Sequence, residues 1–446
     1  RAQMNSLPRT RPRTLYELAI QVALIRPGPL QGDMVHPYIR RKRGEEPIDL
    51  IHPSLAPILR RTLGVPLFQE QGMRLAIEAA DFSADEAELL RRAIGSSRTR
   101  HLLPHLLSKL EKGLKKRGIN DEAIDRVIMQ IASFSTYGFP ESHSTSFALL
   151  VYASAWLKCF HPAEYLCAML NAQPMGFYSP ASLIQDARRH GVEVRPPCLR
   201  FSAWRCLMEN HTVRLGLRSV GGLGPKEREK LARALLEGPF NSAIDVIRRA
   251  DLPRDALITL AQSGAFSAFI SENRRDAVWR VLHLSRHVAG PLPLGPPVEQ
   301  QLSFPEQTPM EQTAEDFKTM GLTTGAHPMT HMRTQLAENG VLRACDLVET
   351  RNGQWVKVAG LVISRQKPET AKGFCFVSME DETGFMNIIV QPKVFERCWP
   401  TIIRSKFLEV EGPVSAEQGV WNVKGLRFKN LVPEGLHYTP ASHDFR

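Results

Sequence analysis

The fold of the middle of the chain depends on one stretch, Leu217-Arg218-Ser219-Val220-Gly221-Gly222-Leu223-Gly224-Pro225-Lys226. Its glycines let backbone N–H groups approach a phosphate closely, and Pro225 suits the first turn of a helix predicted over 226–237. The helix N-terminus adds a partial positive charge. The stretch predicts a helix-hairpin-helix that grips a nucleic-acid backbone without reading bases, and its candidate DNA-binding residues are Gly221, Gly222, Gly224 and Lys226. An ordinary glycine-rich turn is the alternative.

A second candidate hairpin lies at 252–266, at about the spacing of a tandem repeat. Short helices and glycine punctuation continue on both sides of it. We therefore expect a tandem helix-hairpin-helix DNA-binding region over 177–285.

Residues 1–176 are predicted to be mostly helical, with Pro/Gly loops such as Arg26–Leu30. Helical spacing runs through 70–80 and 85–94, and Ser83 with Glu86 forms a capping-box pattern before the second of these. An apolar helix over 152–172 is expected to break at His161-Pro162.

A Pro/Gln/Thr-rich segment, 286–330, is predicted to be an extended linker. The remainder, 331–446, changes to five short β-rich runs separated by turn signals, namely 355–363, 374–379, 385–390, 407–412 and 420–426. Five such strands predict a C-terminal OB-type β-barrel, and a sandwich fragment is the alternative. The fold class expected for the 446 residues is multidomain α+β.

The charge balance favours polyanionic partners. Lys and Arg number 57 against 46 Asp and Glu, giving +11 at neutral pH and a pI near 9.4. Nine cations fall between 91 and 118, including Lys115, Lys116 and Arg117, with Glu111 as the one acid. Clustered cations bind phosphates by releasing counterions, so we expect DNA contact here. A solvated helix face is the alternative.

Several classes of protein and site are excluded. The longest apolar stretch, 147–157, is too short to cross a membrane. Seven scattered cysteines without a CxxC pair indicate a reducing, cytoplasmic location and no structural metal. P-loop, GxSxG, HExxH, Lys-x-Asp-Gly and Asp-x-Asp patterns are missing. No catalytic residue is therefore expected in these 446 residues. Because the chain begins with Arg1, we expect it to be a piece of a longer polypeptide.

A loop at 135–144 places Tyr, His and hydroxyl side chains before an apolar helix. Such a loop can present donors to a phosphate or a base edge, and His143 is the candidate residue. A capping or packing role for His143 is the alternative.

Ordered motifs along the chain resemble the fingers region and C-terminal part of bacterial family C DNA polymerases, the DNA polymerase III alpha subunit family. The motifs are those at 26–30, 68–71, 90–95, 137–144, 216–220, 264–266, 321–328 and 380–384. The opening 1–4, the 321–328 motif and the ending 442–446 resemble the error-prone branch. The chain departs from the family at Ser96-Ser97, where basic or polar residues are usual.

The resemblance implies template-directed nucleotidyl transfer by an error-prone DNA polymerase, in translesion synthesis during the DNA damage response. The palm and its Mg²⁺-binding aspartates would lie upstream of Arg1. Arg91 and Arg92 would hold the incoming deoxynucleoside triphosphate, with His143 lining the nucleotide pocket. The hairpin would grip duplex primer–template DNA.

The resemblance further implies that the barrel handles single-stranded template, with Trp355, Phe374 and Phe376 as candidate stacking residues. Gln300–Phe304 resembles the peptide that docks on a sliding clamp, and damage-response accessory proteins would be further partners. A catalytically silent DNA-binding module is the alternative function. A ligase-like enzyme is disfavoured by the missing Lys-x-Asp-Gly and by the opposite domain order.

Overall fold

The computed structural model describes residues 2–24, 35–95, 98–133, 139–176, 178–288, 304–367, 371, 373–417, 419–433 and 443–445. The chain forms two compact units, one of residues 1–155 with 418–420 and the other of 156–417 with 421–446. The Arg26–Leu30 loop, Ser96-Ser97 and Tyr137-Gly138 lie outside the described residues. Within the described ranges no helix is long and apolar enough to cross a membrane.

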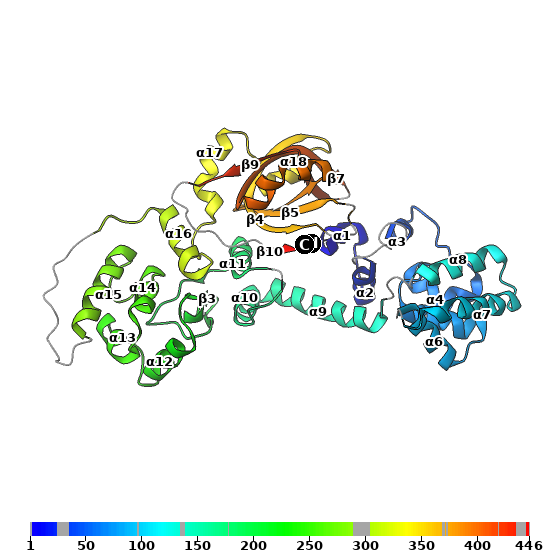
Figure 1. Cartoon of the computed structure of the whole chain (residues 1–446), viewed down its shortest axis with the longest axis horizontal. Helices are drawn as coiled ribbons and strands as arrows, with labels where there is room; N and C mark the ends of the chain where they lie inside the picture. Colours follow the sequence, from blue (N-terminus) through cyan, green and yellow to red (C-terminus); the bar gives the residue numbers. More distant parts are fainter. Residues whose placement is uncertain are drawn as a thin grey trace. The chain divides into compact units, whose positions relative to one another are not determined.

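The first unit is helical (Figure 1). Its helices are α1 (Ala2–Thr10), α2 (Leu15–Leu24), α3 (Val35–Lys42), α4 (Ala56–Leu59), α5 (Gln69–Arg74), α6 (Ala84–Gly95), α7 (Leu103–Lys116) and α8 (Asp121–Ser133). A π-helical turn at Leu75–Ala79 follows α5, and 3₁₀ turns lie at Pro53–Leu55, Arg60–Thr62 and Arg100–Leu102. A single apolar core joins α4 to α8, and its fully buried members include Leu90, Leu110 and Leu114.

Local sequence chemistry explains these helices. The Ser83 N–H donates to Glu86 at 2.9 Å and the Glu86 N–H donates to the Ser83 hydroxyl at 3.2 Å, which confirms the predicted capping box before α6. On α7 the buried leucines recur at helical spacing, so one stripe faces the core and the lysines face away.

Helix α9 (Glu141–Phe160) begins inside the predicted 135–144 loop, so His143 lies in the first turn of a helix rather than in a loop. Helix α10 (Pro162–Asn171) follows it. The two are separated at His161, where Pro162 occupies the first turn of α10, so the predicted break is confirmed.

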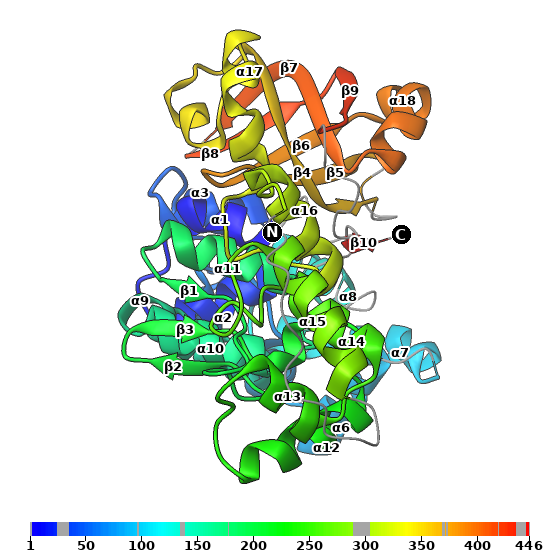
Figure 2. The ribbon, with the colours of Figure 1, turned by 90° about the vertical axis from the view of Figure 1, so that its left-hand side faces the viewer.

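In the second unit, α10 and α11 (Pro180–Arg189) pack with a small sheet of β1 (Val194–Arg195), β2 (Leu207–Glu209) and β3 (Thr212–Arg214), in the order β1-β3-β2. No strand is predicted from the sequence in this region, because these strands are only two or three residues long. The region that follows holds α12 (Pro225–Leu236), α13 (Ala243–Ala250), α14 (Arg254–Gln262) and α15 (Arg274–Val288) (Figure 2). Phe240 and Phe266 are buried in the apolar core of this region.

Part of the predicted linker is corrected. Residues 309–320 form α16, whose N-cap Thr308 accepts the Glu311 N–H at 3.2 Å while the Thr308 N–H donates to Glu311 at 2.8 Å. Phe317 is buried, so packing as well as capping holds this helix. Residues 289–303 lie outside the described residues. A 3₁₀ turn at Pro328–Met332, α17 (Arg333–Glu338) and a 3₁₀ turn at Ala344–Glu349 lead into the barrel.

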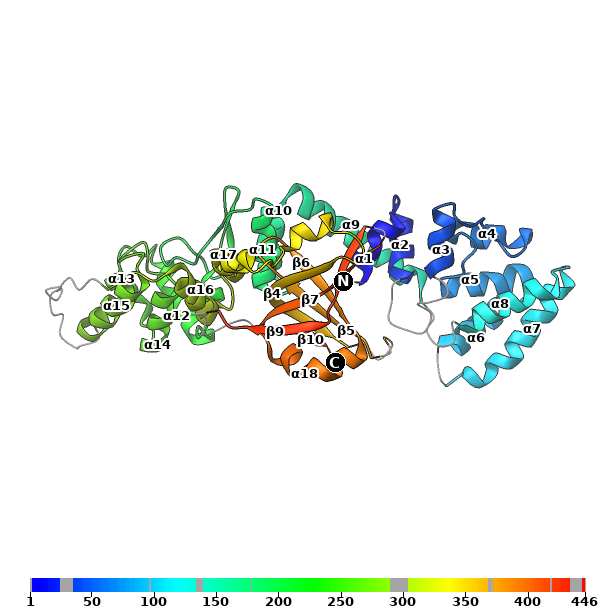
Figure 3. The same cartoon turned by 90° about the horizontal axis from the view of Figure 1, so that it is seen from above.

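The C-terminal sheet closes on itself (Figure 3). Its strands are β4 (Trp355–Gln366), β5 (Cys375–Glu380), β6 (Phe385–Val390), β7 (Phe407–Glu417), β8 (Val420–Lys424), β9 (Arg427–Leu431) and β10 (His443–Phe445), in the order β10-β4-β5-β6-β8-β7-β9. Antiparallel pairing of β4 with β7, from Trp355↔Pro413 to Leu361↔Phe407, completes the barrel. Helix α18 (Pro392–Arg404) adds buried Val394 and Ile402 to the barrel core. The predicted OB-type barrel is confirmed, and closure excludes the open sandwich fragment.

Candidate nucleic-acid interface

The first hairpin lies at the surface between a 3₁₀ turn (Leu217–Ser219) and α12. Gly221 and Gly222 are exposed, and Gly222 has φ 75°, a conformation that favours glycine. The Gly221 N–H donates to the Thr319 carbonyl at 2.7 Å, and the Gly224 N–H donates to Glu227 Oε2 at 2.9 Å. Two amides predicted to reach a phosphate are therefore bonded within the fold.

Other groups of the hairpin remain open to a ligand. Among the described residues, no acceptor bonds the N–H of Gly222 or Leu223. The Lys226 side chain is exposed and has no ion pair within the described part of the chain. Arg218 is structural instead, because its guanidinium donates to the carbonyls of Asn171 at 3.1 Å and Gln173 at 2.9 Å.

A second hairpin joins α13 to α14 through Asp251, whose φ is 44°. Arg249 ties this hairpin to the first. It pairs with Asp245 at 3.0 Å and Glu237 at 3.2 Å and donates to the Gly238 carbonyl at 2.7 Å. The two helix pairs also share one apolar core, which contains Leu231 of α12, Val246 of α13 and Leu257 of α14.

The basic run of the first unit is partly neutralised. Lys115 pairs with Glu111 at 3.0 Å and with Asp121 at 3.2 Å, and Arg117 pairs with Asp81 at 2.6 Å. These pairs are largely exposed, so each adds little stability. Lys116 is exposed with no ion pair in the described ranges, so it stays available to a phosphate.

Arg91 and Arg92 lie on α6 and share one carboxylate. Arg91 is bidentate on Glu88, at 2.7 and 2.8 Å, and Arg92 Nε lies 3.0 Å from the same carboxylate. Hydrogen bonds from Arg91 and then Arg92 lower the pKa of Glu88 to about 2, so the carboxylate is charged at neutral pH. The two arginines and Glu88 together therefore carry one net positive charge.

His143 is exposed in the first turn of α9 and contacts two aromatic rings, with centroid distances of 5.5 Å to Phe139 and 4.6 Å to Phe147. The helix start is held by Glu70, which accepts the Glu141 N–H at 2.8 Å. The hydrogen bond to Glu88 is the main cause that raises the pKa of Arg91, and the charge of Glu70 adds to it.

The barrel exposes aromatic side chains. Trp355 is 52% exposed at the start of β4 and lines a hollow of about 380 Å³ with Lys357. The Arg427 guanidinium lies 5.8 Å from the Trp355 ring centroid. Phe376 is exposed on β5 and Phe374 is half-buried. An exposed indole beside cations has the chemistry of a base-stacking site.

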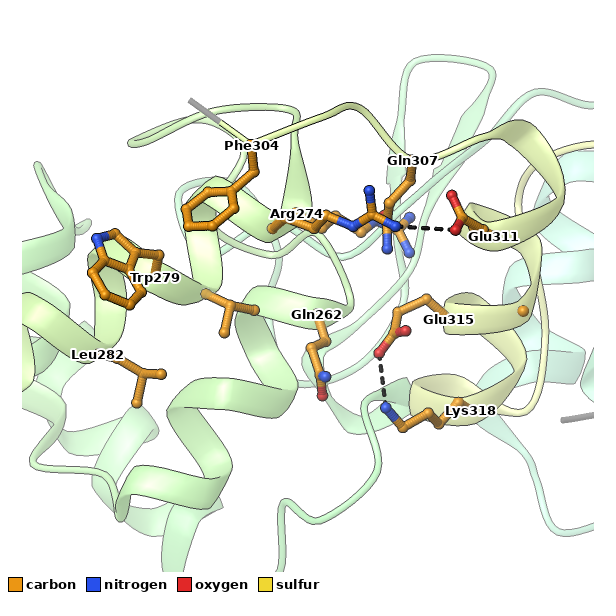
Figure 4. A pocket seen from close by; sticks show the side chains of 12 residues that line it. Gln262, Arg274, Trp279, Leu282, Phe304, Gln307, Glu311, Glu315 and Lys318 are labelled. Atoms are coloured by element: carbon orange, nitrogen blue, oxygen red, sulfur yellow. Dashed lines mark hydrogen bonds and ion pairs between the residues drawn. The ribbon is translucent and has the colours of Figure 1, made fainter. Parts of the chain in front are cut away.

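A cavity of about 720 Å³ lies between α15 and α16 (Figure 4). Phe304 faces Trp279 across it, with ring centroids 5.9 Å apart. The Phe304 N–H donates to Asp276 at 3.0 Å, and its carbonyl accepts from Asn273 at 2.9 Å. Phe304, the last residue of the predicted clamp peptide, is therefore part of the packed fold. Residues 300–303 of that peptide lie outside the described residues.

The 380–384 motif joins the barrel to α11. Arg189 pairs with Glu380 at 2.8 Å, and Ser182 lies 3.3 Å from the same carboxylate. Burial outweighs these contacts and raises the pKa of Glu380 to about 7. Asp381 is fully buried and accepts the N–H of Ala344 at 2.7 Å, and it also accepts N–H groups of its own turn. The motif is structural rather than a ligand site.

No group of three His, Cys, Asp or Glu in the described ranges could hold a metal ion. The described residues thus do not fit a Mg²⁺ site.

Comparison with protein families assigns each region. Residues 1–118 match the bacterial DNA polymerase III alpha subunit finger domain, residues 191–277 the helix-hairpin-helix motif, and residues 356–431 the OB-fold nucleic acid binding domain. Each match falls inside a domain predicted from the sequence, while the predicted boundaries at 176, 285 and 330 stay predictions.

Curated relatives are named error-prone DNA polymerases. The protein of Anaeromyxobacter sp. (strain K) is 45% identical over 437 residues, which cover 95% of this chain and 38% of that protein. Error-prone DNA polymerase 2 of Agrobacterium fabrum is 41% identical over 464 residues, covering 100% of this chain and 42% of that protein. The error-prone DNA polymerase of Alkalilimnicola ehrlichii is 44% identical over 437 residues, which cover 95% of this chain and 41% of that protein.

The chain therefore spans 38 to 42% of the length of these relatives. The predicted family resemblance is confirmed. A crystal structure of asparaginyl-tRNA synthetase from Pyrococcus horikoshii is 20% identical over 20% of this chain and 22% of that chain, and its TM-score of 0.17 supports no conclusion.

Proposed function

We propose that this chain, which belongs with the error-prone branch of the bacterial DNA polymerase III alpha family, supplies the nucleotide-phosphate and duplex-DNA contacts of a DNA-directed DNA polymerase. One observation carries the proposal. Nearly the whole chain is similar to error-prone DNA polymerases, and its hairpin region exposes Lys226 beside unbonded amides of Gly222 and Leu223. Exposed amides and a free cation are the groups that hold a DNA backbone.

In the proposed reaction a primer 3′ hydroxyl attacks the α-phosphate of a deoxynucleoside triphosphate. Mg²⁺ supplies charge stabilisation when bound, and we place it in a palm outside this chain because the described residues do not fit it. The residues of this chain orient phosphates instead. We extend the proposal to translesion synthesis in the DNA damage response, to accessory partners and to a cytoplasmic location. The relatives' name, error-prone DNA polymerase, is the starting point for this extension.

The first test is binding of the purified chain to a labelled primer–template duplex, followed by primer extension. We expect binding that weakens as salt rises, because phosphate contacts release counterions, and no extension by the chain alone. Failure of the purified chain to bind duplex DNA at low salt would refute the proposed DNA-binding function. Extension without a palm would contradict the assigned place of the metal ions.

The alternative is a DNA-binding module without catalytic function. The lack of a metal-binding cluster among the described residues favours it. Joining the chain to the remaining part of a relative separates the two functions. A polymerase whose extension depends on the hairpin supports the first, and extension that is indifferent to Lys226→Ala supports the module.

The nucleotide contact has its own test in such a joined polymerase. Arg91→Ala with Arg92→Ala is expected to raise KM for nucleotide and lower kcat/KM by about ten- to a thousandfold. Glu88→Gln is expected to lower KM, since it frees both guanidiniums from their shared carboxylate. An arginine pair that serves only the helix would leave KM unchanged in both variants.

We also propose that residues 300–304 dock on a sliding clamp. Phe304→Ala alone is ambiguous, because Phe304 packs against Trp279 within the fold. Leu302→Ala is the cleaner variant, and in the whole chain Trp279→Ala controls for loss of local packing around Phe304. Binding of a 295–310 peptide to purified clamp that is lost on Leu302→Ala supports docking, and no binding ends it.

A further inference from the structure

A hollow of about 410 Å³ lies where α13, α14 and α15 meet. Three arginines line it, Arg248 from α13, Arg254 from the first turn of α14 and Arg286 from α15. The sequence does not mark this arrangement, because the three positions are spread over 39 residues (248–286) and belong to no charge run. We refer to it as the arginine hollow.

The three guanidiniums are exposed, and none has an ion pair or a hydrogen bond within the described part of the chain. The neighbouring Arg249 behaves in the opposite way. Its side chain is 17% exposed and is held by two carboxylates and by backbone carbonyls. Arg249 stabilises the fold through these contacts, whereas the three arginines of the hollow make no such contact with the described residues.

The acid at the rim does not neutralise the arginine hollow. Asp251 lines it, but its carboxylate pairs with Lys230 at 2.8 Å, and the same ammonium also bonds the Asp251 backbone carbonyl. Buried Ile247, Leu252 and Leu257 supply its apolar lining, and Ser285 also lines it. Three guanidiniums without a partner in the described residues, next to apolar side chains, attract a compact anion.

We propose that the arginine hollow binds a backbone phosphate of duplex DNA. The proposal rests on the DNA-binding function proposed above and adds a second phosphate contact beside the glycine hairpin. Guanidiniums form paired hydrogen bonds with phosphate oxygens, and the carboxylate that lines the hollow, Asp251, is already paired with Lys230. No aromatic side chain lines the hollow, so a base or a nucleotide has nothing to stack on. The recognised group is therefore the phosphodiester itself.

The test measures the anisotropy of a labelled 20-base-pair duplex with the full chain, from 50 to 300 mM KCl. Loss of one phosphate contact reduces the slope of log K against log salt by about 0.9, equivalent to roughly a fivefold weaker affinity at 0.15 M. Arg248→Ala/Arg254→Ala/Arg286→Ala should show both changes. Replacing all three with lysine should keep the slope, because the charges remain.

A matched control is Arg233→Ala, which removes an exposed arginine of α12 that does not line the hollow. It should bind duplex like the wild type, whereas Arg248→Ala alone should weaken binding. Titration with inorganic pyrophosphate distinguishes a free anion from DNA. Pyrophosphate binding that is lost in the triple variant, with duplex binding unchanged, overturns the proposal.

These measurements distinguish failure of the proposed DNA-binding function from failure of the arginine hollow as a phosphate site. A wild-type chain that does not bind duplex at 50 mM KCl refutes the proposed function. A wild-type chain that binds duplex, together with a triple variant of unchanged slope, refutes only the arginine hollow.

Discussion

Helix α7 packs against the end of the π-helical turn at one glycine, and this contact allows a sharp prediction. A Cβ added at Gly113 would lie 2.4 Å from the Ala80 carbonyl oxygen, 2.6 Å from its Cα and 2.7 Å from its Cβ. No side chain can rotate away, because all three atoms belong to the backbone or its first carbon. An ordinary contact needs about 3.4 Å, so α7 must move by about 1 Å and loosen Leu110 and Leu114 from the core.

The magnitude follows from two opposing effects. Overpacking of a core costs about 3 kcal/mol at the upper end of its usual range. Replacing glycine by alanine inside a helix stabilises the folded state by about 1 kcal/mol. Gly113→Ala should therefore lose about 2 kcal/mol of stability in the first unit. Gly72→Ala on α5 is the matched control, because nothing lies within 4 Å of its added Cβ. It should gain about 0.5–1 kcal/mol.

Hydrogen exchange of the whole chain, read by mass spectrometry on peptides from α7 and α8, measures both variants in the core they share. A loss of 2 kcal/mol speeds the slowest exchange roughly thirtyfold, and the control slows it about two- to fivefold. Protection that is unchanged in Gly113→Ala, or that moves the same way in both variants, would refute the packing argument.

Three further predictions concern the barrel and its junction with α11. Asp381→Asn should cost about 2–3 kcal/mol, because the new amide faces the Ala344 N–H where a carboxylate oxygen accepted it, and unchanged exchange of β5 would contradict this. Burial raises the pKa of Glu380 from its ordinary 4.5 to about 7, so the folded state holds a proton that the unfolded chain releases. Stability should therefore fall as pH rises from about 4.5 to about 7; urea titrations at pH 5 and 8 measure this fall, and a fall that persists in Glu380→Gln would exclude this carboxyl as its source. Trp355→Ala should weaken binding of a single-stranded oligonucleotide by about 1–3 kcal/mol, whereas Trp399→Ala, which removes another exposed indole, should leave it unchanged, and equal effects would argue against stacking.

Elements fixed by neighbouring residues could be predicted from the sequence. The capping box of Ser83 and Glu86, the helix break at His161 and the barrel strands all depend on patterns a few residues long. Helix α16 was missed because prolines and glutamines dominate the composition around it, although Thr308-Pro309 followed by Glu311 is itself a helix-start pattern. Strands β1 to β3 are too short for any period to be visible, and only their pairing in space defines them.

The candidate site was harder to predict, because its groups are bonded to distant parts of the chain. The Gly221 N–H donates to the carbonyl of Thr319, which lies nearly a hundred residues further along the chain. No local sequence pattern indicates such a contact. The pairing of Arg91 and Arg92 with Glu88 is different, since carboxylates three and four residues before a cation are readable helix partners. That signal was present in the sequence and was overlooked.

The state of each cation, paired or unpaired, decides where a polyanion can bind. In the run from 91 to 118, Arg91, Arg92, Lys109, Lys115 and Arg117 all have carboxylate partners. A phosphate must compete with each partner before it gains contact, so the run attracts DNA less than its density suggests. The arginine hollow has fewer cations and no run, but none of its guanidiniums has a partner to displace among the described residues. Because unpaired charge gains a new partner on binding, we expect the tightest phosphate contacts of this chain in the hairpin region rather than in the denser run.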